Sequence, residues 1–136
     1  EGQPPPVDLA AERRNGDFVR SLIGLGSVTA CHDLSDGGLL VAIAEMALKS
    51  ELGASIRTPD SGQLHAWAFG EDQARFVVSS EDGTALIAAA KDAGIEITKI
   101  GMVNGTSELK FGDNDTICLA ELSAVFESCI PSLMAR

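Results

Sequence analysis

The residues best suited to chemistry in this chain lie in one short segment, residues 32–40, with the sequence HDLSDGGLL. The segment joins an apolar run to a long apolar stretch, as a turn from a strand into a helix does. Such a turn presents backbone N–H groups without helical partners, and these carry partial positive charge and can bind phosphate. Gly37 and Gly38 would let a ligand approach closely, because no Cβ stands in its way. Residues 32–40 are therefore a candidate phosphate or nucleotide site.

The carboxylates of the same segment oppose a bare phosphate. With Asp33 and Asp36 ionised, a phosphate would need Mg²⁺ between carboxylate and oxygen, unless the carboxylates face a ribose hydroxyl or a neighbouring backbone. The alternative role is structural: Ser35 is the N-cap of a helix, Asp36 complements the helix dipole, and the glycines permit tight packing of strand on helix. Residue types alone leave both interpretations open.

A second polar cluster, residues 69–76 with the sequence FGEDQARF, stands directly before an apolar strand pattern. Arg75 could hold a phosphate through two parallel hydrogen bonds, or it could pair with Glu71 or Asp72 on the surface. Gln73 adds an amide to the same cluster. The sequence contains no HExxH, Walker A or GxSxG motif, so no familiar catalytic signature accompanies the two clusters.

The apolar patterns predict the elements that position these clusters. We expect helices from Asp8 to Gly24 or Gly26, over residues 36–50, over residues 82–93 and over residues 121–130, the last broken at Pro131. Asp8 would be the N-cap of the first helix, and Ser80 or Asp82 would lie near the cap of the third. We expect strands over residues 28–32, 54–57, 75–79, 95–100, 108–111 and 116–119, and Met102–Val103 would continue the fourth of these past Gly101 through a bulge. Asn104–Gly105 predicts a hairpin that pairs the strands on either side of it. The predicted class is α+β, with helices packed on a mostly antiparallel or mixed sheet.

Composition limits the classes of function. The 136 residues carry a net charge of −10, which argues against nucleic acid and anionic membranes as partners. Cys31, Cys118 and Cys129 are too widely spaced for a disulfide framework or a zinc site and indicate a reducing, cytoplasmic setting. No signal peptide or membrane-spanning run is visible. We expect residues 1–6, with three consecutive prolines, to be a linker and residues 7–136 to be the domain.

Three segments together resemble a known family. Residues 30–47 and 69–79, with residues 7–23 before them, are similar to the C-terminal domain of the aminoimidazole-ribonucleotide (AIR) synthetase-like superfamily. Within it, the combination of HDLSDGG with GEDQARF resembles the synthetase subunits of phosphoribosylformylglycinamidine synthases, in their shorter bacterial form. The resemblance covers nearly the whole chain.

The resemblance implies a fragment of an ATP-dependent ligase of purine biosynthesis. That enzyme converts formylglycinamide ribonucleotide and glutamine-derived ammonia to formylglycinamidine ribonucleotide, using ATP and Mg²⁺. Its partners would be the remaining domains of the same synthetase, a separate glutaminase and a small accessory subunit. The catalytic and metal residues would lie in earlier domains, so we expect none in this chain and no activity from it alone.

The same resemblance implies a set of candidate ligand residues in this chain. The nucleotide- or phosphate-binding candidates are Asp33, Ser35, Asp36, Gly37, Gly38, Glu71, Gln73 and Arg75. The alternatives are a domain of another ATP-using enzyme of the superfamily that holds a nucleotide, and a purely structural domain that shapes the packing against its sister domains.

Overall fold

The computed structural model describes residues 7–60, 62–113 and 115–135, apart from the side chains of Cys129 and Ile130. The predicted linker, residues 1–6, lies outside the described residues. The chain divides into two compact units, which are described separately below. The first comprises Glu1–Ile43 and Gly62–Lys99, and the second comprises Ala44–Ser61 and Ile100–Arg136.

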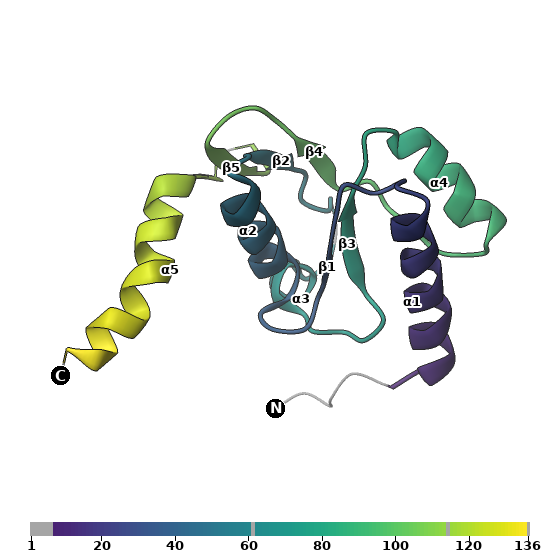
Figure 1. Cartoon of the computed structure of the whole chain (residues 1–136), viewed down its shortest axis with the longest axis horizontal. Helices are drawn as coiled ribbons and strands as arrows, with labels where there is room; N and C mark the ends of the chain where they lie inside the picture. Colours follow the sequence, from purple (N-terminus) through teal and green to yellow (C-terminus); the bar gives the residue numbers. More distant parts are fainter. Residues whose placement is uncertain (1–6, 61, 114, 136) are drawn as a thin grey trace. The chain divides into compact units, whose positions relative to one another are not determined.

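The first unit is built on a two-stranded antiparallel ladder (Figure 1). Strands β1 (Ala30–Asp33) and β3 (Phe76–Ser79) pair with His32 opposite Val77. Helices α1 (Leu9–Gly24), α3 (Leu64–Phe69), α4 (Gly83–Asp92) and the first part of α2 (Gly38–Ser50) belong to the same unit. The buried apolar side chains of this unit are Leu22, Leu34, Leu39, Ala42, Ile43, Ala68, Leu86 and Ala90.

Two aspartates begin helices of this unit as the sequence predicts. The Asp8 carboxylate accepts hydrogen bonds from two N–H groups of the first turn of α1, both at 3.0 Å. The Asp82 carboxylate does the same for α4, at 3.1 and 2.9 Å. Each cap satisfies donors that have no partner inside the helix, which fixes where the helix begins.

The predicted start of α2 is wrong by two residues. The helix begins at Gly38, so Ser35 is not its N-cap and Asp36 does not lie in its first turn. Gly37 and Gly38 have φ angles of +81° and +73°, in the left-handed region that residues with a Cβ avoid. The chain therefore turns at Gly37 and at Gly38, the first residue of the helix.

The second unit contains a four-stranded mixed sheet in the order β4-β2-β5-β6. Its strands are β2 (Ala54–Ile56), β4 (Gly101–Val103), β5 (Glu108–Phe111) and β6 (Asp115–Cys118), and helix α5 (Leu119–Met134) follows β6. β2 is antiparallel to β4 and parallel to β5. The α+β class is confirmed, and the strands are divided between two sheets.

The predicted hairpin at Asn104–Gly105 is wrong, because β2 lies between the two strands that it was expected to pair. Gly53, just before β2, donates its N–H to the carbonyl of Thr106 at 2.7 Å and accepts from the Asn104 N–H at 2.9 Å. Asn104 Oδ1 also accepts from the Thr106 N–H at 3.0 Å, which closes a local turn without strand pairing. The turn therefore carries the chain across β2.

The strand predicted over residues 95–100, with a continuation at Met102–Val103, is confirmed only at that continuation, which lies in β4, and is wrong for residues 95–100. Its alternating burial is present, with Ile95 and Ile97 half-buried and Glu96 exposed, but these residues have no place in either ladder. The segment contains the division between the units, after Lys99. The alternation of apolar and polar residues in this segment reflects which side chains are buried, and it does not indicate strand pairing.

The predicted break at Pro131 does not occur, because α5 continues to Met134. Proline lacks an N–H donor but keeps its carbonyl, and Pro131 O accepts from Ala135 N–H at 3.0 Å. In the part of the chain that the structure describes, every helix is too short or too polar to cross a membrane.

Candidate functional site

The antiparallel ladder of the first unit brings the two polar clusters together. The Leu34 N–H donates to Arg75 O at 3.2 Å, one step beyond the last ladder pair of Asp33 with Phe76. Further along, the Gly37 N–H donates to Glu71 Oε1 at 2.8 Å. Two segments that are 34 residues apart at this contact are thus joined by backbone and side-chain hydrogen bonds.

The glycines allow this close approach. A Cβ on Gly38 would stand 2.6 Å from the carbonyl carbon of Phe69 and 2.8 Å from its Cα, closer than side chains are found. A Cβ on Gly37 would stand 2.6 Å from Cγ2 of Val41. We use the name glycine corner for Gly37 and Gly38 together with residues 69–71. Its backbone packing admits glycine alone at Gly38. The tight packing expected from the sequence is present, but it joins the start of α2 to the end of helix α3 and not a strand to a helix.

The charges around the glycine corner are mainly negative. Arg75 pairs with Asp72 at 3.1 Å, so the surface ion pair is the arrangement that the structure shows for this arginine. Asp33, Asp36 and Glu71 are exposed, as are the predicted site residues Ser35 and Gln73. A bare phosphate at the corner would therefore meet the Glu71 carboxylate on the Gly37 N–H and an arginine that already has an anionic partner.

The backbone N–H of Gly37, which the sequence offered as a phosphate donor, already has a hydrogen-bond partner. The Glu71 carboxylate occupies the Gly37 N–H in the position that an anion would take. Among the described residues, no three His, Cys, Asp or Glu side chains are grouped to hold a metal ion, and no buried side-chain nitrogen or oxygen lacks a partner. The Gly37 N–H thus has an anionic partner within the chain, and the nucleotide- or phosphate-binding role of these residues stays a prediction.

The neighbouring strand β1 offers no activated nucleophile. Partial burial, and then the negative charge of Asp33, raise the pKa of the Cys31 thiol above its ordinary value. His32 Nδ1 lies 2.7 Å from Asp33 O and 3.5 Å from Asp33 Oδ1, so its ring is held against its own neighbour.

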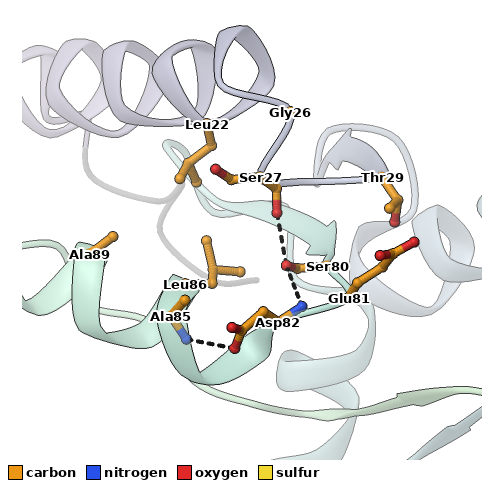
Figure 2. Close-up of a pocket in the computed structure, with 10 residues that line it drawn as sticks. All are labelled: Leu22, Gly26, Ser27, Thr29, Ser80, Glu81, Asp82, Ala85, Leu86 and Ala89. Carbon is orange, nitrogen blue, oxygen red and sulfur yellow. Dashed lines mark hydrogen bonds between the residues drawn. The ribbon is translucent and has the colours of Figure 1, made fainter.

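A separate hollow of about 490 Å³ lies between the end of α1 and the start of α4 (Figure 2). Leu22 and Leu86 supply apolar walls, and Ser80 lies between the two segments. Ser80 Oγ donates to Ser27 O at 2.8 Å and accepts from the Asp82 N–H at 3.2 Å. None of the predicted site residues lines this hollow.

The sequence did not indicate this hollow, although it did place Ser80 or Asp82 near a helix cap. The cap signal is local, whereas the hollow depends on where α1 ends relative to α4. Residues 22–29 have the composition of an ordinary helix end, so the sequence does not indicate that some of them line a hollow.

Residues 1–114 match the family described as AIR synthase related protein, C-terminal domain. Because the match covers most of the 136 residues, the chain belongs to this family.

The chain is also similar to individual proteins along almost its whole length. The chain is 52% identical over 134 residues to the phosphoribosylformylglycinamidine synthase subunit PurL of Parvibaculum lavamentivorans, and 49% identical over 136 residues to that of Methylocella silvestris. These alignments cover 97% and 98% of the chain but only 18% of each relative. The chain therefore spans less than a fifth of the length of these relatives.

Solved structures agree on the fold. Phosphoribosylformylglycinamidine synthase II of Thermotoga maritima superposes with a TM-score of 0.73 at 22% identity, over 88% of this chain and 22% of that one. The T. maritima PurL complexed with ADP superposes with a TM-score of 0.73 at 17% identity, over 90% of this chain and 26% of that one.

Proposed function

We propose that this chain is the C-terminal domain, residues 7–136, of the synthetase subunit of a phosphoribosylformylglycinamidine synthase. The observation that carries the proposal is the identity of about half of all residues to PurL subunits along almost the whole chain. The two motifs that the sequence singled out are also the two segments that meet at the glycine corner. Their contact at one corner explains why the two motifs occur together in the same sequence.

The proposed activity belongs to the longer protein. It is an ATP-dependent ligase that forms formylglycinamidine ribonucleotide from formylglycinamide ribonucleotide and glutamine-derived ammonia, with Mg²⁺, in purine biosynthesis in the cytoplasm. T. maritima PurL has been solved with ATP, with ADP and with FGAR, and as PurLQS. By analogy, the partners are the other domains of the subunit, a glutaminase and a small accessory subunit.

Within that protein the domain serves as a scaffold and is inactive alone. The Glu71 carboxylate supplies the anion at the Gly37 N–H, and the corner thereby fixes the start of α2 against the end of α3. Because the Glu71 carboxylate already binds this N–H, the corner can form without a bound phosphate. The interpretation is supported by the ion pair of Arg75 with Asp72, which leaves the nearby arginine already paired with a carboxylate.

The test is a chimera, made by replacing the matching segment of the Parvibaculum PurL subunit with this chain. We expect the purified chimera, supplied with ammonia, ATP, Mg²⁺ and formylglycinamide ribonucleotide, to form ADP within about tenfold of the natural subunit's rate, while the isolated chain forms none. A chimera that folds but does not turn over contradicts the proposed function. Turnover by the isolated chain contradicts the assignment of catalysis to other domains.

The second candidate is a nucleotide-holding site formed by Asp33, Ser35, Asp36, Gly37, Gly38, Glu71, Gln73 and Arg75. The engaged Gly37 amide argues for the scaffold, and calorimetric titration with ADP and Mg²⁺ separates the two roles. We expect no heat of binding at millimolar ligand. Binding that a Glu71→Ala variant strengthens would show instead that the carboxylate competes with phosphate for the amide.

A further inference from the structure

Helix α5 has a continuous apolar face that its own unit covers only at the start. Leu119, Leu122, Phe126 and Leu133 are spaced three, four and seven residues apart, so they fall on one side of the helix. Leu119 is 7% exposed where α5 packs against β6, whereas Phe126 and Leu133 on the same face are 62% and 64% exposed. We use the name α5 stripe for Leu122, Phe126 and Leu133.

The exposed apolar surface of α5 extends beyond the residues of the α5 stripe. Val125 and Met134, at its two margins, are 68% and 83% exposed. The opposite side of the helix carries Ala120, Ala124 and Ser128, and Glu121 and Glu127 lie between this side and the apolar side. An amphipathic helix whose apolar side its own unit leaves uncovered has the form in which a helix enters a partner's groove.

Charge argues against a second copy of this chain as the occupant. Residues 119–134 contain two glutamates and no lysine or arginine, and each chain carries a net charge of −10. On the helix, Glu121 borders one margin of the apolar side and Glu127 borders the other. Two α5 helices in contact would bring four carboxylates together, whereas lysines or arginines on the rim of a groove would complement them.

The comparisons favour another part of the same polypeptide. The family match ends at residue 114, before α5, whereas the alignment with the Parvibaculum subunit covers 134 residues of the chain. The helix is therefore shared with PurL subunits beyond the segment that the whole family shares. This chain makes up only 18% of such a subunit, so most of its potential neighbours are domains of the same protein.

We infer that the α5 stripe docks into an apolar groove, rimmed by lysine or arginine, on another domain of the synthetase subunit. The inference rests on the proposed function, and it adds to it a surface through which this domain is held in the longer protein. The stripe would act as a non-covalent clamp at high effective concentration, because both partners belong to one chain.

The test uses hydrogen exchange of the amides of residues 122–134 in the chimera described above and in the isolated chain. We expect exchange in the chimera to be slower by at least about 30-fold, as burial of two anchoring side chains at an interface implies. The double variant Phe126→Glu with Leu133→Glu should abolish this protection. The matched control, Ala120→Glu with Ala124→Glu, adds the same charge on the opposite side and should retain it.

Several outcomes would overturn the inference. Equal exchange in chimera and isolated chain would show that the stripe has no partner within the subunit. Protection in the isolated chain that rises with its concentration would identify a second copy, and protection only after the glutaminase or accessory subunit is added would identify a separate protein. Turnover of the chimera is measured independently, so failure of the docking inference is distinguishable from failure of the proposed function.

Discussion

Replacing Gly38 with alanine tests the glycine corner, because two separate costs fall on this one position. The first is conformational: at φ +73° an L residue is disfavoured by about 1–2 kcal/mol. The second is steric: the new Cβ would stand 2.6 Å and 2.8 Å from backbone atoms of Phe69, and these cannot rotate away as a side chain end can. Such overpacking costs about 1–3 kcal/mol more.

Gly94 provides the matched control. Its φ of +65° is in the same region, but a Cβ there would meet nothing within 4 Å. Gly94→Ala therefore carries the conformational cost alone, about 1–2 kcal/mol. The difference between the two variants isolates the contact of the glycine corner with the end of α3.

Thermal unfolding followed by circular dichroism measures this difference. For a chain of this size each kcal/mol lowers Tm by about 3–4 °C, so we expect Gly94→Ala to lose about 3–8 °C and Gly38→Ala about 6–20 °C. Urea unfolding of the same variants gives the free energies directly. A Gly38→Ala protein no less stable than Gly94→Ala would refute the close approach of residues 69–70 to the corner.

Three further predictions concern single side chains. Gly16→Ala, in the middle of α1 with open space around it, should raise the free energy of unfolding by about 0.5–1 kcal/mol, and a decrease in a urea titration would contradict this. Glu71→Ala should lower stability by about 0.5–1.5 kcal/mol and move the amide NMR signal of Gly37, whereas Glu71→Gln, which keeps an acceptor oxygen, should lower it less; an unmoved signal would count against the 2.8 Å hydrogen bond. Because the pKa of Cys31 is raised by burial and by Asp33, its alkylation should reach half its maximal rate at a higher pH than a free thiol does. Asp33→Asn should shift that midpoint downward, and a profile unchanged by this substitution would remove the carboxylate as a cause.

Local signals in the sequence predicted local features of the structure. Asp8 and Asp82 cap the helices that follow them, since a cap depends only on the next three residues. The short apolar runs over residues 28–32 and 75–79 likewise located both strands of the β1–β3 ladder. For the same reason, the ion pair of Arg75 with Asp72, three residues apart, was among the alternatives considered.

Non-local contacts decided where prediction failed. The strong turn signal at Asn104–Gly105 says nothing of Gly53, about fifty residues earlier, whose backbone bonds both sides of that turn. Two polar clusters were found in the sequence, but their junction through Gly37 and Glu71 depends on strand pairing that no local pattern encodes. The start of α2 moved from Asp36 to Gly38 because that junction and the glycine φ angles override the capping preference of Ser35.

The most direct test of the central claim is genetic. The segment of the Parvibaculum PurL gene that matches this chain is replaced in the chromosome by the sequence encoding residues 1–136, and growth is scored with and without added purine. The account predicts growth without purine, because the domain supplies the scaffold that its relative supplies. A strain that makes the chimera in folded form and still requires purine would contradict it.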